Sequence, residues 1–297
     1  MIWGSADNGY TIVETMVFLV VTAALFASAM AAVSGRQASV QFTQGIRDAQ
    51  SKMQEIINDV STGYYPSNGD FACSAATGTT DRPTFTAVAT PQGSSNECTF
   101  LGKSVHFTTN AADVGSGAVR YNILSIAARR VNAAGLEVQS LNEALPTAIA
   151  PTAVGGMAGI SDKTSKQELQ FGIKVTRITA PVMGGGGLSV GPLYGSVVFL
   201  SSLPKTAGVG NSLASGKQRV SFAGLPSATP LIDDVYAAAN SVNGITDALI
   251  VNPQNGIIIC LSDQDGSRRA MITVGQGSGQ ASAKLDIGSY NKAVCEG

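Results

Sequence analysis

The chain has 297 residues, and its 19 Lys and Arg residues nearly balance its 20 Asp and Glu residues. This balance gives no global attraction to nucleic acid, which binds strongly basic surfaces. Charged residues make up only 13% of the chain, a composition that suits an extracellular surface or a subunit packed against other subunits.

Residues 15–33 form an uncharged and strongly apolar stretch that follows a single carboxylate, Glu14. As a helix, this stretch is about 29 Å long, close to the ~30 Å thickness of a bilayer core. A charged side chain in hydrocarbon costs about 2.5–3.5 kcal/mol on insertion scales. Glu14 is therefore expected to have a partner and a function.

The residues before this stretch, Gly9-Tyr10-Thr11-Ile12-Val13-Glu14, resemble the type IV prepilin signature. In that signature a glycine precedes the cleavage site, and a glutamate is the fifth residue of the mature chain. The resemblance implies a leader peptide over residues 1–9, removed between Gly9 and Tyr10 by a prepilin peptidase that also methylates the new N-terminus. It further implies a transmembrane helix over residues 10–34, with Glu14 pairing with the N-terminal ammonium of a neighbouring subunit.

A secretory signal peptide is one alternative, since Ala29-Met30-Ala31 fits an A-x-A cleavage site. Such a peptide carries a basic region before its apolar region, whereas residues 1–9 contain no Lys or Arg. A plain single-pass anchor with one stray carboxylate is a second alternative. The apolar stretch that follows the glycine favours the prepilin interpretation.

The helix is expected to continue beyond the membrane as an amphipathic segment over residues 35–61. Apolar positions recur there at helical spacing, in a stripe too short to favour a coiled coil. Gly35 and Gly45 weaken the helix locally and allow it to bend. The stripe consists of Phe42, Ile46, Ala49, Met53, Ile56 or Ile57, and Val60. The charged positions expected to face away from it are Arg47, Asp48, Lys52, Glu55 and Asp59.

Residues 62–297 are predicted to form a β-rich head, because short alternating or β-branched runs are separated there by Gly, Pro, Asn and Ser. The fold class is therefore α+β and pilin-like, with a long N-terminal helix packed on an antiparallel β-rich head. The predicted strands are 103–108, 119–128, 169–179, 194–201, 219–223, 248–252, 256–262 and 270–274.

Three connecting segments have distinct compositions. Residues 251–256, Val-Asn-Pro-Gln-Asn-Gly, indicate a hairpin between two of the strands. Residues 184–187 are four glycines, read as a flexible loop because no phosphate-binding Lys-Ser/Thr follows. Residues 134–166 are rich in small and polar residues, and are interpreted as a surface excursion with a short helix at 139–144 that divides the head into two lobes.

The four cysteines are Cys73, Cys98, Cys260 and Cys295, and no C-x-x-C spacing indicates a zinc site. An exported chain favours two disulfides. Of the three possible pairings, the local one, Cys73–Cys98 with Cys260–Cys295, closes the smallest loops. Free thiols in a reducing compartment are the alternative.

Residues 247–274 resemble the final strands of H-type pseudopilins and FimT-like minor pilins. In those proteins a strand, a Pro/Gly turn, a strand with a cysteine and an Arg-led strand follow one another, as they do here around Cys260 and Arg268-Arg269. The likeness is confined to this C-terminal part of the chain, and the middle of the chain resembles no family.

No catalytic or metal-binding constellation is recognised, and no cofactor is expected. His106 is the only histidine and lies in an alternating strand, where a structural surface role is favoured. Asp263-Gln264-Asp265-Gly266 lacks the later acidic ligand of a calcium loop and indicates a turn. The basic doublets at 129–130 and 268–269 lack the neighbouring aromatic residues of a single-stranded DNA site, so nucleic-acid binding is not favoured.

The sequence is thus interpreted as a minor pilin or pseudopilin subunit of a type IV filament system, with other pilin subunits and a prepilin peptidase as partners. It would be anchored in the inner membrane before assembly and lie in an extracellular filament or at the cell surface afterwards. A filament-tip adhesin or DNA-uptake receptor is the alternative. A membrane-anchored enzyme is disfavoured because catalytic groups were not recognised.

Overall fold

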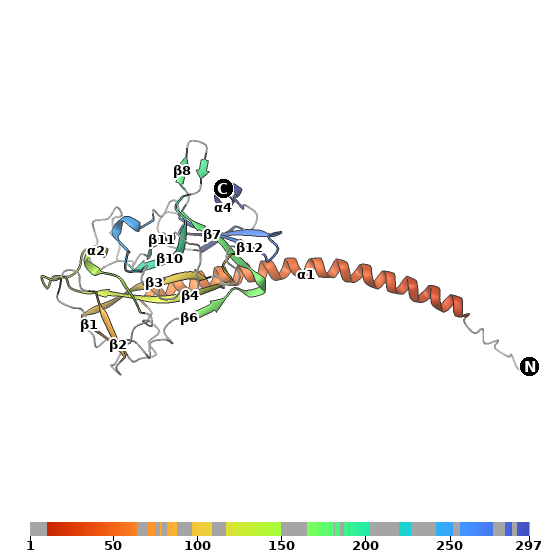
Figure 1. Ribbon diagram of the computed structural model, residues 1–297, viewed down its shortest axis with the longest axis horizontal. Helices are drawn as coiled ribbons and strands as arrows, with labels where there is room; N and C mark the ends of the chain where they lie inside the picture. The colour runs from red at the N-terminus through yellow and green to blue at the C-terminus, as the bar shows by residue number, and fades with distance from the viewer. Residues whose placement is uncertain are drawn as a thin grey trace, which may run out of the picture. The chain divides into compact units, whose positions relative to one another are not determined.

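The computed structural model combines one long N-terminal helix with antiparallel β-sheets, which confirms the α+β layout (Figure 1). It falls into two compact units, residues 1–44 and 45–297. The residues described are 11–63, 71–74, 78, 82–87, 97–108, 117–149, 165–180, 182–184, 187–189, 191–201, 220–226, 242–251, 256–275, 283–286 and 290–296.

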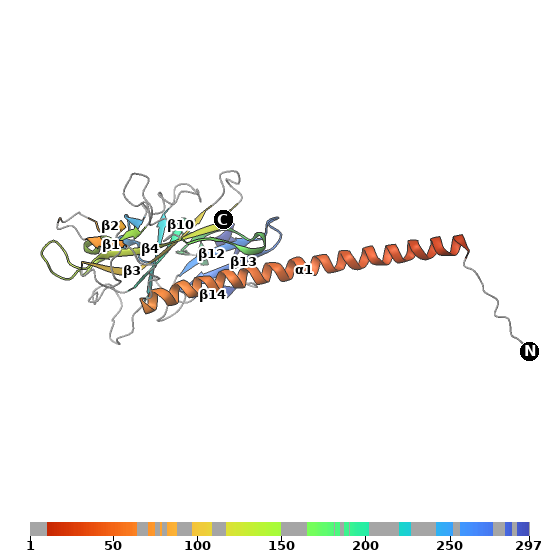
Figure 2. The same ribbon diagram turned by 90° about the horizontal axis from the view of Figure 1, so that it is seen from below.

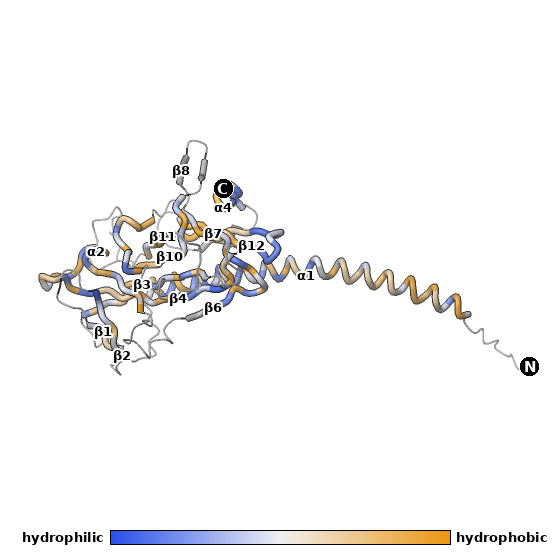
Figure 3. Tube along the Cα trace, viewed as in Figure 1, coloured by the Kyte–Doolittle hydropathy of each residue, from blue (hydrophilic) through white to orange (hydrophobic). Residues whose placement is uncertain are grey.

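Helix α1 runs from Ile12 to Thr62 without interruption. Its first half is long and apolar enough to cross a membrane, judged by length and composition, and is the hydrophobic part of the helix in Figure 3. Large apolar side chains are exposed there, among them Phe18 at 69% and Phe26 at 66%. The hydroxyls of Thr22 and Ser28 donate to the carbonyls of Phe18 and Leu25, so the helix satisfies its own polar side chains.

The second half of α1 buries the stripe that the sequence predicts, and lies along the sheets in Figure 2. The charged side chains of Arg47, Asp48 and Glu55 are exposed as expected, and Lys52 is half-exposed. Asp59 does not face away as expected, because it bonds to Lys103 in the first sheet. The buried residues of the stripe are Phe42, Ile46, Ala49, Met53, Ile56, Ile57 and Val60.

Gly45 allows a close approach between the helix and the turn before strand β7. A Cβ atom at this position would lie 2.5 Å from Ile173 Cδ1 and 3.0 Å from the Gln170 carbonyl oxygen. A larger residue at position 45 would therefore require the Ile173 side chain to move and the Gln170 carbonyl to shift slightly. The helix continues through Gly35 and Gly45.

The first large sheet is antiparallel and has the strand order β11-β10-β3-β4-β5, with β6 also pairing with β4. One face packs on helix α2 (Leu141–Ala144) and on Val242 and Ile245, in a core that includes Leu124 and Val198. The strands are β3 (Cys98–Thr108), β4 (Arg120–Arg129), β5 (Thr147–Ile149), β6 (Ser165–Glu168), β10 (Tyr194–Ser201) and β11 (Val220–Pro226).

The second large sheet is also antiparallel, with the order β14-β13-β12-β7. Its strands are β7 (Lys174–Thr179), β12 (Ile257–Ser262), β13 (Arg269–Val274) and β14 (Ala283–Asp286). The two sheets do not divide the chain at residues 134–166, because β10 and β11 return to the first sheet after β7 has joined the second. Residues 45–297 form one compact unit.

Two smaller hairpin sheets complete the described strands. Strand β1 (Phe71–Ser74) pairs with β2 (Thr84–Ala87), and β8 (Val182–Gly184) pairs with β9 (Gly187–Ser189). Gly184 and Gly187 pair with each other, so the glycine run ends two strands and is not only a loop. Residues 185–186 lie outside the described part of the chain.

Most predicted strands are confirmed, but two are wrong in part. In the predicted strand 169–179 only Lys174–Thr179 is extended, because η3 (Gln170–Gly172) is a 3-10 turn with Phe171 at φ 58°. The predicted strand 248–252 is replaced by the 3-10 turn η4 (Asp247–Leu249). Ile250 then bridges to Ala223 of β11, so the predicted pairing with β12 does not form. The short helix expected at 139–144 is α2, capped by Ser140.

Candidate functional site

The candidate site is the start of helix α1. Thr11 is its N-cap: its carbonyl accepts the amide of Thr15 at 3.1 Å, and its Oγ1 accepts the amide of Glu14 at 3.3 Å. A carboxylate in the first helical turn also interacts favourably with the helix dipole. Gly9 and Tyr10, the expected cleavage residues, lie outside the described residues.

Glu14 is exposed, with the exposed apolar side chains of Val13, Val17 and Phe18 around it on the helix. The next charged residue after Glu14 in the chain is Arg36. Twenty-two residues of helix separate the two charges by about 33 Å, far beyond the reach of an ion pair. No Lys or Arg of residues 15–35 is therefore available to pair with Glu14.

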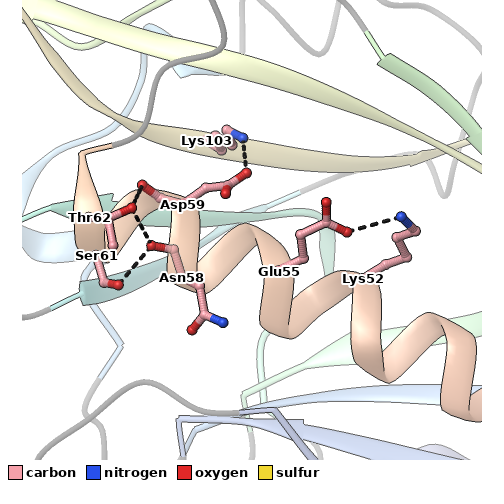
Figure 4. Close-up of polar contacts among 7 residues, drawn as sticks. All are labelled: Lys52, Glu55, Asn58, Asp59, Ser61, Thr62 and Lys103. Carbon is pink, nitrogen blue, oxygen red and sulfur yellow. Dashed lines mark hydrogen bonds and ion pairs between the residues drawn. The ribbon is translucent and has the colours of Figure 1, made fainter.

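In the head, a buried ion pair joins α1 to the first sheet. Lys103 Nζ lies 2.5 Å from Asp59 Oδ2, with 7% of the lysine side chain and 25% of the aspartate side chain exposed (Figure 4). Lys103 lies between Phe199 of β10 and Ser125 of β4 in the sheet register. A second pair, Lys52–Glu55 at 3.0 Å, lies on the exposed side of the helix and is worth little. The buried pair was not evident from the sequence.

Tyr121 of β4 lies close to the same helix. Its ring packs on Phe107 with the centroids 5.8 Å apart. Burial, reinforced by the negative charges of Asp48 and Glu55, raises the pKa of Tyr121 to about 12. The phenol is therefore neutral at physiological pH and acts as part of the packing beneath α1.

The four cysteines form the two local pairs that the sequence analysis favoured. Cys73 is bonded to Cys98 and Cys260 to Cys295, with Cα–Cα distances of 6.1 and 5.8 Å. The first bond attaches strand β1 to β3. The second attaches helix α4 (Lys292–Cys295) to β12.

His106 belongs to a polar row that sequence reasoning did not recognise. In the register of β10, β3 and β4, Ser196, His106 and Asn122 lie side by side, and His106 Nδ1 is 2.5 Å from Ser196 Oγ. Ser196 and Asn122 are each 2% exposed, so a substrate does not reach the serine. His106 is half-buried, so it is less exposed than the surface position that the sequence predicted.

The other motifs mostly serve the fold. Burial alone would raise the pKa of Asp263, but hydrogen bonds from Ser267 and Arg268 outweigh it and hold the pKa below its usual value. These bonds close the turn at 263–268, as the sequence indicated.

The two basic doublets contain arginines with partners inside the fold. Buried Arg129 donates to the carbonyls of Glu143 and Gly78, while Arg269 pairs with Glu296 and lies over the Tyr290 ring. Within the described residues, no group of three or more His, Cys, Asp or Glu is placed to hold a metal ion.

Comparisons with protein-family models, with curated proteins and with solved structures find no match.

Proposed function

We propose that the chain is a membrane-anchored minor pilin or pseudopilin subunit of a type IV filament system. The observation that carries the proposal is the change of burial along one continuous helix. Up to Val33 α1 exposes large apolar side chains, whereas from Phe42 to Val60 its apolar stripe is buried. Such a helix packs its second half on a head, and its exposed first half suits an apolar environment outside the chain.

The apolar half of α1 has two successive environments in this proposal. The membrane holds it before assembly, since exposure of so much apolar surface to water is unfavourable. The apolar helices of neighbouring subunits surround it in the filament. The same side chains serve both states, because each environment is apolar and makes no sequence-specific polar contact.

Glu14 supplies the polar contact that sets the register between subunits. A carboxylate held among apolar helices is unfavourable unless it is paired. Its helix has no cation within reach, and the N-terminal ammonium created by cleavage before Tyr10 has the required charge. An ammonium of the neighbouring subunit then selects one axial offset between the two helices.

The first prediction concerns the mature N-terminus. In cells that hold a prepilin peptidase, the protein is expected to begin at Tyr10, because Gly9 fits the position before the cut. Mass spectrometry of the N-terminal peptide measures this directly. Gly9→Val, which fills the space beside the scissile bond, should leave membrane-bound precursor with residues 1–9 attached. A chain starting near Ala32 would instead identify a secretory signal peptide.

The second prediction separates the charge of Glu14 from its place in the first helical turn. Glu14→Gln keeps a side chain that is common at this position of a capped helix but loses the charge, and Glu14→Ala loses both. Both variants should be cleaved and membrane-bound, yet enter filaments at least about ten-fold less than wild type, which corresponds to a lost interaction of about 1.4 kcal/mol. The measurement is the ratio of protein in sheared filaments to protein in membranes.

A matched control for this experiment is Thr22→Val, which changes a side chain of the same helix that bonds only to the helix's own carbonyls. It should enter filaments at the wild-type level. Wild-type incorporation of Glu14→Gln would show that the charge has no role in register, and a loss confined to Glu14→Ala would assign the effect to the helix start.

A further inference from the structure

An Asn–Gly step lies in a tight turn whose two ends belong to the core of the head. The amide of Ile245 donates to the carbonyl of Val242 at 3.1 Å, so Asn243 and Gly244 are the central residues of the turn. Val242 and Ile245 are buried in the cluster that covers the first sheet. Asn243 is half-buried and Gly244 is exposed, so solvent reaches the Gly244 side of the peptide group between them.

Arg82 contacts the same peptide group from a distant part of the chain. Its guanidinium donates through Nη2 to the main-chain carbonyl of Asn243, and through Nη1 to the carbonyl of Pro146 at 2.6 Å. Arg82 lies 161 residues before Asn243, so only the folded head brings the two together. A hydrogen bond from a charged donor is stronger than one between neutral groups. The fold thus places a positive charge on the Asn243–Gly244 peptide group.

This positive charge should make the Gly244 nitrogen more acidic. When a peptide N–H loses its proton, the negative charge is shared between the nitrogen and the carbonyl oxygen of the same peptide group. A guanidinium already bonded to that oxygen stabilises the charge as it develops. The deprotonated nitrogen is a nucleophile, and Cγ of Asn243 is the electrophile with which it closes a five-membered ring. Glycine has no Cβ that obstructs this approach.

The side-chain oxygen of Asn243 does not oppose this ring closure. Oδ1 is buried and has no hydrogen-bond donor within the described part of the chain. Leaving a buried acceptor unpaired is unfavourable, so this bond-free arrangement does not hold the side chain in place. Rotation of the side chain toward the Gly244 nitrogen therefore breaks no hydrogen bond of Oδ1.

We propose that Asn243 is a site of spontaneous deamidation that Arg82 promotes. Hydroxide removes the proton of the Gly244 nitrogen, and the nitrogen attacks Cγ of Asn243. The Cγ–Nδ2 bond breaks, ammonia leaves after taking a proton from water, and a succinimide ring remains. Water then opens the ring at Cγ to give aspartate, or at the main-chain carbonyl carbon to give isoaspartate. The net change is hydrolysis of the side-chain amide, and no oxidant or reductant is needed.

Both products change the charge of the turn, and one changes its main chain. Aspartate at position 243 adds a carboxylate to the residue that Arg82 contacts, so the guanidinium gains an anion nearby. Isoaspartate adds one carbon to the main chain between Val242 and Ile245, whose buried side chains have little room to adjust. The reaction therefore marks the age of the folded head. It needs no other protein, so it is independent of the proposed filament function.

The test is the rate of deamidation of the folded, full-length chain in detergent micelles at neutral pH, followed by peptide mapping with mass spectrometry. Arg82→Met removes the guanidinium and keeps an unbranched side chain. It should slow the reaction at Asn243 about ten-fold, the ratio expected for one lost hydrogen bond to a charged group. Arg82→Lys, which keeps the charge, should fall between the two. Arg47→Met is the matched control and should react like wild type, because Arg47 is exposed on helix α1.

Unfolding gives a second measurement that does not depend on how well the variants fold. In guanidinium chloride, wild type and variants should react at the same rate, similar to that of the Asn–Gly steps at 68–69 and 255–256. The wild-type site should react faster folded than unfolded, although folding ordinarily slows deamidation by restricting the side chain. A site that reacts no faster when folded would overturn the role of the fold.

The products and the variants decide the remaining steps. Ring closure predicts both isoaspartate and aspartate, and Gly244→Ala should slow the formation of both. Aspartate alone would show direct hydrolysis of the side-chain amide and overturn the attack by the Gly244 nitrogen. Equal or faster deamidation of folded Arg82→Met would overturn the role of Arg82. An unchanged Asn243 in a chain whose reference steps have reacted would overturn the site itself.

Discussion

Replacing Asp59 by alanine is expected to lower the free energy of unfolding of the head by about 3 kcal/mol. The change leaves the ammonium of Lys103 buried without its anion, between Phe199 and Ser125 in the sheet register. The value lies at the lower end for a broken buried pair, because 25% of the Asp59 side chain is exposed and water reaches that side. Urea unfolding of the full chain in detergent micelles, followed by circular dichroism, measures the loss.

A double-mutant cycle separates the pair from the packing around it. Lys103→Met removes the buried charge and keeps most of the side-chain volume, so it should cost only about 1 kcal/mol. In the Lys103→Met background, Asp59→Ala should have little further effect, which gives a coupling energy of about 3 kcal/mol, the whole loss that Asp59→Ala causes when Lys103 is present. Additive losses in the cycle would show that the two side chains contribute independently and that the ion pair does not attach the helix to the sheet.

The helix could be predicted in detail because its pattern is local. The stripe from Phe42 to Val60 repeats at helical spacing, and each of its residues is buried. Asp59 was misplaced because the same spacing puts it on the polar side of the helix. Only the register of β3, which brings Lys103 beneath the last turns of α1, shows its true partner. Long-range pairing of this kind leaves no periodic signal in the sequence.

The strands show the same division between local and long-range information. The long strands β3, β4, β10, β12 and β13 have enough alternating or β-branched residues to be recognised. Strands β1, β2, β5, β6, β8, β9 and β14 have only three or four residues each, and were missed. The turns at Phe171 and Asp247 interrupt segments whose composition suits a strand, since Phe171 adopts φ 58° and Ile250 pairs with β11.

For the candidate site, the residue types could be read from the sequence, whereas the position at which the helix begins is known only from the structure. Glu14 and the expected cut after Gly9 follow from their spacing to the apolar segment. The N-cap formed by Thr11 follows from two hydrogen bonds. The row of Ser196, His106 and Asn122 needed the register of three strands, and could not be read from the sequence because Ser196 of β10 lies 90 residues from His106 in the chain.

Removing the Cys260–Cys295 disulfide is expected to lower the free energy of unfolding by about 4 kcal/mol. The bond closes a sequence separation of 35 residues, and the chain-entropy model gives this value for a loop of that size. The folded state should keep helix α4 in place. Val294 packs with Ile258 and Met271, and Arg269 pairs with Glu296 near the chain end. The loss should therefore come from the gain in freedom of the unfolded chain.

Cys260→Ala/Cys295→Ala tests this prediction, with Cys73→Ala/Cys98→Ala as the matched variant. The Cys73–Cys98 bond closes a separation of 25 residues, and its removal should lower the free energy of unfolding slightly less, by about 3.5 kcal/mol. Urea unfolding of each full-length variant in micelles measures both losses, and circular dichroism of the native state checks that the sheets persist.

In the wild type, alkylation after unfolding without reductant should label no cysteine, and peptide mapping should recover only these two pairs. Labelled cysteines would place the chain in a reducing compartment. A peptide joining Cys73 to Cys295 would disprove the local pairing, because this disulfide would attach β1 to helix α4, whereas the local pairing attaches β1 to β3 and helix α4 to β12.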